Sequence, residues 1–191
     1  MRWSFAGIHD RTAKERFARR NGTQGALQRA RMTNEPLTLP IAVTVAKLIA
    51  DLTANAAKAH LVVTDWTKHK QTARCAELNY PSGELAAILL CDLPFCAFSG
   101  ASLMAFPAPV AQACIKAGDL NESLRENFAE IANVLTGAFR EFDQRVILGA
   151  IHVGLAKLPS ECATLLQSKR RAQFELEFPR YGVGHCAFLL R

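Results

Sequence analysis

Hydrophobic and polar residues recur with a helical period over residues 121–139, NESLRENFAEIANVLTGAF. At about 100° per residue, one narrow side of such a helix is entirely apolar and consists of Leu124, Phe128, Ile131, Leu135 and Phe139. The opposite side forms a column, which we call the polar column, of Glu126, Glu130, Asn133 and Gly137. The pattern therefore predicts a helix that buries its apolar side and exposes the polar column to solvent.

The rest of the chain alternates between strand-like and helix-like segments. Helices are predicted over 41–58, 107–117 and 160–167, and strands over 60–66, 74–80, 84–91, 96–106, 146–158, 172–178 and 183–190. In the clearest strand, Phe174, Leu176 and Phe178 alternate with polar residues and are expected to face inward. Because strands follow one another in pairs with helices between them, we predict an α+β fold in which the 121–139 helix and a shorter helix pack on an antiparallel sheet.

Gly137 is the unexpected member of the polar column. A glycine inside a helix costs roughly 1 kcal/mol relative to alanine, and core packing gives no reason for it on an exposed face. The backbone of a partner that comes close to the helix would give one. The alternative is a solvated face on which the glycine begins to fray the helix.

The net charge of +6 is concentrated at the N-terminus. Residues 1–31 contain eight Lys and Arg against two acidic residues, whereas residues 32–191 carry equal numbers of basic and acidic groups. We predict a basic, disordered leader over 1–31 and a single domain over 32–191. Two alternatives stay open: the leader binds an acidic surface, or it is non-native sequence ahead of a true start at Met32.

Neither a membrane span nor a metal centre is predicted. The uncharged run from Leu93 to Ile115 is long enough to cross a membrane, but Pro94, Pro107 and Pro109 argue against one continuous helix. The six cysteines include no Cys-x-x-Cys pair, and the five histidines do not join them in metal-ligand spacing. We therefore expect reduced thiols in a cytoplasmic protein, with a disulfide or a metal site as the less favoured alternative.

The segment Glu130-Ile-Ala-Asn133-Val-Leu-Thr-Gly137 resembles the helix motif of the CheC/CheX/FliY family of chemotaxis phosphatases. In that family an acidic residue, and an asparagine three positions later, act on the phosphorylated receiver domain of a response regulator. The order of elements over residues 84–191 is similar too. CheC carries two such helices, whereas the first helix here offers Asp51-Leu-Thr-Ala-Asn55, one residue too long to match. The resemblance therefore implies one site, as in the CheX pattern.

Carried over residue by residue, the resemblance implies a phosphatase that accelerates hydrolysis of the receiver's aspartyl phosphate. Asn133 would orient the attacking water and Glu130 would dock on the receiver, so these two are the predicted catalytic residues. Glu126 and Gly137 would contact the partner. No cofactor of its own is expected, because the receiver supplies a divalent metal ion such as magnesium.

The expected partner is a phosphorylated response-regulator receiver domain, and no nucleic acid is expected. Whether the protein forms a homodimer is left open. The alternative function is a non-catalytic, CheC-like binding module that docks receiver domains or flagellar-switch components. His152 and His185, each on a predicted strand, are interpreted as hydrogen-bonded sheet residues and not as catalysts.

Overall fold

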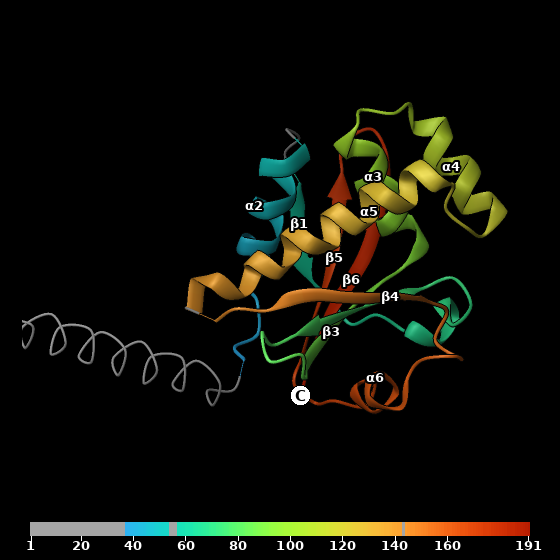
Figure 1. Cartoon of the computed structure of the whole chain (residues 1–191). Coiled ribbons are helices and arrows are strands. Elements are labelled where there is room, and N and C mark those ends of the chain that lie inside the picture. Colours follow the sequence, from blue (N-terminus) through green and yellow to red (C-terminus); the bar gives the residue numbers. More distant parts are fainter. Residues whose placement is uncertain (1–36, 54–56, 143) are drawn as a thin grey trace, which may run out of the picture. The chain divides into compact units, whose positions relative to one another are not determined.

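A six-stranded antiparallel sheet forms the centre of the fold (Figure 1). The computed structural model describes residues 37–53, 57–142 and 144–191. The strands are β1 (Lys58–Leu61), β2 (Arg74–Asn79), β3 (Leu85–Cys91), β4 (Ile147–Val153), β5 (Arg171–Phe178) and β6 (Gly182–Leu190). They lie in the order β1-β5-β6-β3-β2-β4, and each neighbouring pair is antiparallel. The edges of the sheet are therefore β1 and β4.

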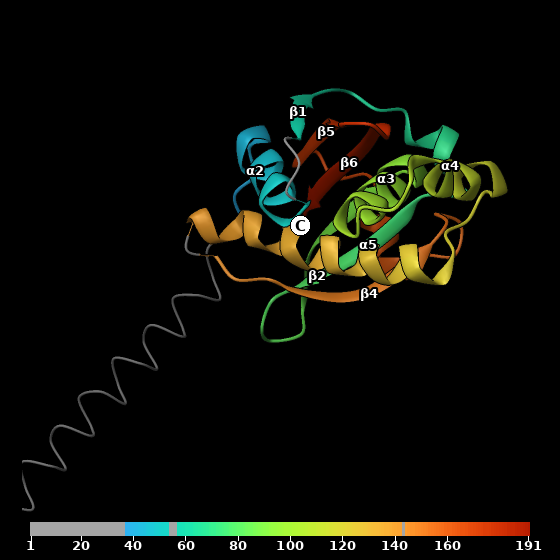
Figure 2. The ribbon, with the colours of Figure 1, turned by 90° about the horizontal axis from the view of Figure 1, so that it is seen from above.

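Helices cover the two faces of the sheet unequally (Figure 2). The helical segments are α2 (Ala42–Thr53), α3 (Leu93–Leu103), α4 (Ala108–Ala117), α5 (Glu122–Leu135), α6 (Ser160–Leu165) and two 3-10 helices, η1 (Trp66–His69) and η2 (Thr136–Phe142). The larger core lies between the sheet and α2, α3, α4 and α5. A smaller core on the opposite face includes residues of α6 together with half-buried Trp66 and Leu155. The predicted α+β class with an antiparallel sheet is confirmed.

The prediction of a strand over 96–106 is wrong, because helix α3 runs through this segment as far as Leu103. Asp92 caps the helix, since its Oδ1 accepts a hydrogen bond from the backbone N–H of Phe95 at 2.7 Å, and Pro94 lies in the first turn. Nearly every residue of α3 is buried, because the helix packs against α4, α5 and β6 at once. A helix surrounded on all sides has no polar face, so its sequence lacks the helical period and is easily taken for a buried strand.

Several other predicted elements are shorter than their patterns indicated. The helix predicted over 41–58 is α2, and Lys58 already belongs to β1. The strand predicted over 60–66 is β1, which ends at Leu61, and Trp66 begins η1 instead. The strand predicted over 146–158 ends at Val153, where Gly154 turns the chain with a φ of 75°. The helix predicted over 121–139 is α-helical to Leu135 and continues as η2.

Other predicted elements are confirmed. Phe174, Leu176 and Phe178 of β5 are buried, as the alternation predicted. The predicted 107–117 helix is α4, and Gly118 ends it in the left-handed conformation. The prediction of a leader over 1–31 concerns residues outside the described part of the chain. Within the described ranges, no helix combines the length and apolar character needed to cross a membrane.

Candidate functional site on helix α5

Helix α5 begins at a well-defined cap. The Oδ1 atom of Asn121 accepts a hydrogen bond from the backbone N–H of Leu124 at 2.9 Å. Just before the cap, the carboxylate of Asp119 accepts from the guanidinium of Arg74 at 2.5 Å, and Arg74 is 2% exposed on β2. The start of α5 is therefore tied to the central sheet.

The rotation of α5 about its axis is set by its apolar side. The five residues of that side are at most 1% exposed: Leu124, Phe128, Ile131, Leu135 and Phe139. Glu126, Glu130 and Asn133 are exposed on the opposite side. The predicted division into a buried side and an exposed polar column is confirmed for these three residues.

Close packing on α3 fixes the position of the helix. A Cβ atom built on Gly100 of α3 would lie 3.0 Å from the carbonyl oxygen of Leu124, so a larger residue would force the two helices apart by a few tenths of an ångström. The same glycine's carbonyl oxygen accepts a hydrogen bond from Asn127 Nδ2 at 3.0 Å. A helix held at its cap and along one side is a rigid support for the exposed side chains.

The side chains of Glu130 and Asn133 are available for a partner. They lie three positions apart and so about one helical turn from each other. Neither makes a side-chain hydrogen bond or an ion pair with any other residue that the structure describes. The main-chain oxygen of Asn133 accepts from Thr136, both from Oγ1 at 2.7 Å and from the backbone N–H. One carboxylate and one carboxamide are thus presented together to solvent.

Contrary to the sequence pattern, Gly137 does not lie on the exposed side of an α-helix. It lies in η2, beyond the α-helix, and it is half-buried. A Cβ atom there would meet Leu48 of α2 at 3.6 Å, which is ordinary van der Waals contact. The cost of a glycine inside an exposed α-helix therefore does not apply, and the side chain of Leu48 lies beside the position that a Cβ atom would take.

The first helix, α2, presents no second copy of the pair within the described residues. Its Asp51 is exposed and forms an ion pair with Lys47 one turn earlier. Asn55, the other half of the imperfect match, lies outside the described residues.

Solved structures of other proteins have a similar fold. No protein-family model and no curated protein matches the sequence. Among solved structures, the chain is similar to FliY of Thermotoga maritima, with a TM-score of 0.55 and 9% identity over 77% of this chain and 82% of that one. It is also similar to FliM of H. pylori, solved in a complex with SpeE, with a TM-score of 0.53 and 8% identity over 78% and 80%. The FliM middle domain of Vibrio alginolyticus gives 0.52 and 6% over 78% and 88%.

The chain has the CheC/CheX/FliY fold. This agrees with the resemblance that the sequence shows over Glu130–Gly137 and in the order of elements over residues 84–191. At these identities the likeness concerns the fold alone. The roles of Glu126, Glu130, Asn133 and Gly137 therefore stay predictions.

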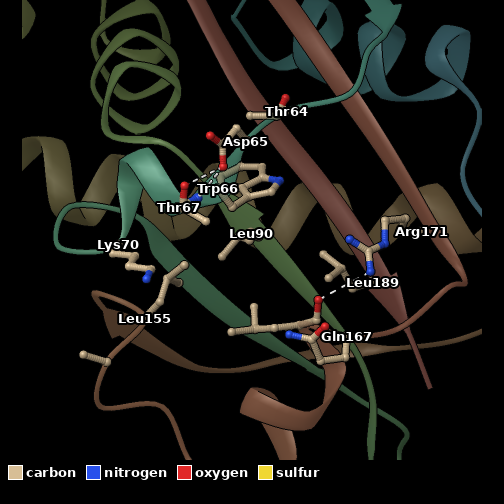
Figure 3. Close-up of a pocket in the computed structure, with 12 residues that line it drawn as sticks. Thr64, Asp65, Trp66, Thr67, Lys70, Leu90, Leu155, Gln167, Arg171 and Leu189 are labelled. Atoms are coloured by element: carbon tan, nitrogen blue, oxygen red, sulfur yellow. Dashed lines mark hydrogen bonds between the residues drawn. The ribbon is translucent and has the colours of Figure 1, made fainter.

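On the other face of the CheC/CheX/FliY fold, a cavity of about 620 Å³ lies between η1, the segment after β4 and the start of β5 (Figure 3). Its lining combines leucines, including Leu90 and Leu189, with Trp66, Lys70 and Arg171. No residue of the polar column lines it. Local sequence patterns do not predict this cavity, because its lining comes from five separate segments of the chain.

Both histidines singled out in the sequence have carboxylate partners. His185 Nδ1 lies 2.8 Å from Asp92 Oδ2, and its Nε2 lies 3.4 Å from Glu175 Oε2. His152 Nε2 lies 2.8 Å from Glu77 Oε1. These contacts fit the interpretation of the two histidines as hydrogen-bonded sheet residues. All six cysteines are buried free thiols.

Proposed function

We propose that the protein is a phosphatase that accelerates hydrolysis of the aspartyl phosphate on a response-regulator receiver domain. The observation that carries the proposal is the pair Glu130 and Asn133, exposed and without side-chain partners among the described residues, on a helix that is held rigidly. The resemblance of the α5 sequence to the motif of this family supplies the substrate class.

The chemistry requires little from the phosphatase. An aspartyl phosphate is a reactive mixed anhydride, and the receiver holds its own divalent metal ion. A helper protein therefore only has to place one water in line with the phosphorus atom. The carboxamide oxygen of Asn133 accepts a hydrogen bond from that water and orients it. An aspartate at this position would instead bring a negative charge towards the phosphoryl group.

Glu130 serves to dock the helix. Its carboxylate engages a basic group at the receiver's active site and so sets the register in which Asn133 meets the water. Glu126, one turn earlier and also exposed, contacts the rim of the same interface. Gly137 contributes less than the sequence suggested, because it is half-buried beside Leu48.

A non-catalytic binding module is the second candidate. The FliM middle domain has a similar fold, so the fold alone does not distinguish a docking protein from an enzyme. The exposed amide of Asn133 favours the enzyme, because a docking surface has no need for a water-orienting group beside its charged anchor.

Two alanine variants test the assignment, because the two residues have different proposed roles. Asn133→Ala is expected to lower the maximal rate of receiver dephosphorylation by orders of magnitude while receiver binding persists, since it removes an interaction made mainly in the transition state. Glu130→Ala is expected chiefly to weaken binding, and its effect should shrink at high salt, because salt screens an exposed ion pair.

Matched controls lie on the opposite face of the sheet. Gln167→Ala removes an exposed amide and Glu161→Ala removes an exposed carboxylate, both in or next to α6. Neither control should change rate or binding. If Asn133→Ala accelerates receiver dephosphorylation as well as the wild-type protein does, Asn133 is not catalytic. The non-catalytic binding module then replaces the phosphatase as the proposed function.

A further inference from the structure

Donor atoms of metal-ligating types gather at the β2–β4 edge of the sheet, on the face opposite to that covered by α5. Glu77 of β2, His152 of β4 and Cys162 of α6 each bring one donor atom to a group whose members lie within 4.8 Å of one another. Glu77 Oε1 lies 2.8 Å from His152 Nε2 and 3.7 Å from Cys162 Sγ. Three separate elements therefore converge on one point.

The backbone is shaped to place the carboxylate there. The pairing of β2 with β4 is irregular between Ala76 and Leu78, where β4 contains one extra residue opposite Glu77. Gly149 lies in this bulge, and a Cβ atom on it would come within 3.0 Å of the Glu77 side chain. The carboxylate also accepts hydrogen bonds from the backbone of Ala150 and the side chain of Asn79.

Hydrogen bonds join the members of this group to one another. The thiol of Cys162 donates to Glu77 Oε1, and a further hydrogen bond joins Cys162 to the buried thiol of Cys75. Burial and the nearby charge of Glu77 raise the pKa of Cys162 to about 11. Burial acts to raise the pKa of Glu77, but the hydrogen bonds from His152 and Ala150 outweigh it and hold that pKa below its usual value. A carboxylate thus faces a protonated thiol and an imidazole.

We propose that Glu77, His152 and Cys162 bind a divalent transition-metal ion of the zinc class. Zinc bonds to carboxylate oxygen, imidazole nitrogen and thiolate sulfur are about 2.0–2.3 Å long, which places the ligand atoms of a tetrahedral site roughly 3.3–3.8 Å apart. The distance from Cys162 Sγ to Glu77 Oε1 already lies in this range. His152 and Glu77 need to separate by about half an ångström, which rotation of two partly exposed side chains allows.

The donor set decides the class of metal. Magnesium and calcium prefer oxygen ligands, whereas a thiolate with an imidazole favours zinc and similar ions. On binding, the thiol proton of Cys162 leaves to solvent. The imidazole proton is exchanged through solvent from Nε2 to Nδ1, so that the Nε2 lone pair of His152 binds the ion. One carboxylate and one thiolate then balance the two positive charges of the ion.

Surrounding residues support the ligands and leave a route for the ion. Asn79 and Ala150 hold the Glu77 carboxylate, and Cys75 can donate to the Cys162 thiolate. The side chains of His152 and Glu77 are 24% and 21% exposed, so the ion can enter from solvent and water can take the fourth position. The bound ion would fasten α6 to the edge of the sheet.

Titration of the reduced full-length protein with Co²⁺ tests the site. We expect one equivalent to give thiolate-to-cobalt charge-transfer absorption together with tetrahedral ligand-field bands, both removed by added Zn²⁺. Cys162→Ser should abolish the charge-transfer band. His152→Gln, a change on a partly exposed edge strand, should weaken binding at least about tenfold, because it removes a direct ligand.

Matched controls are Cys114→Ser, which removes another buried thiol on α4, and His60→Gln, which removes a histidine of the other edge strand, β1. Both should bind Co²⁺ as the wild type does. The proposal is overturned if the wild-type protein gives no thiolate band, if the band survives in Cys162→Ser, or if the controls lose it equally. The titration of the wild-type protein can refute the site by itself, so the test does not depend on whether a variant folds.

Discussion

The orientation of α5 decides which side chains the helix offers to a partner, and Phe128→Ala tests it. Phe128 is 1% exposed and lies on the apolar side of α5, over the larger core. Truncation of a buried phenylalanine to alanine costs about 3–5 kcal/mol, from the lost transfer free energy and the cavity left behind. A domain of this size is stable by about 5–15 kcal/mol, so the variant should lose a large fraction of its stability.

Denaturant unfolding followed by circular dichroism measures the effect. The free energy of unfolding should fall by about 3 kcal/mol or more with the slope unchanged, and the melting temperature should fall by about 6 °C or more. Glu126→Ala is the control, because it lies on the exposed side of the same helix and should change stability by no more than about 0.5 kcal/mol.

A different result would refute the orientation. If Phe128→Ala cost less than about 1 kcal/mol, or no more than Glu126→Ala, the apolar side would not face the core. The exposure of Glu130 and Asn133 depends on the same rotation of the helix, so the proposed function would lose its structural basis.

Three further predictions concern the stability of the fold. Asn121→Ala should lower the free energy of unfolding by about 1 kcal/mol, because the backbone N–H of Leu124 loses its cap, whereas Asn121→Asp should keep most of the stability. Asp119→Ala should lower the free energy of unfolding by about 1–3 kcal/mol, because it leaves the buried guanidinium of Arg74 without its carboxylate. Asp119→Asn keeps an acceptor and should cost less; equal losses of stability in the two variants would contradict this reason. Deletion of residues 1–31 should leave the melting temperature unchanged, since that segment carries charge without an apolar period; a large fall would show that it packs on the domain.

Local pattern predicted α5 well because one of its sides faces the core and the other faces water. The same reasoning failed for α3, where burial on all sides removed the polar half of the pattern. It also misjudged Gly137, because whether a residue on the exposed side of a helix meets solvent or a neighbouring helix depends on where α2 packs.

Local sequence patterns could not predict the group formed by Glu77, His152 and Cys162. His152 and Cys162 lie 75 and 85 positions after Glu77. They meet only because β4 pairs with β2 and because α6 folds back onto the same face. A search for metal ligands by short spacing does not detect such a group, and the strand order is needed to find it.

The central claim is that the exposed pair Glu130 and Asn133 promotes hydrolysis of a receiver's aspartyl phosphate. The most direct measurement is the decay rate of phosphorylated receiver domains with and without this protein, tried across the response regulators of its organism. We predict that at least one receiver loses its phosphate faster with the wild-type protein and at its intrinsic rate with Asn133→Ala. Intrinsic decay of every receiver in the presence of folded wild-type protein would contradict the account.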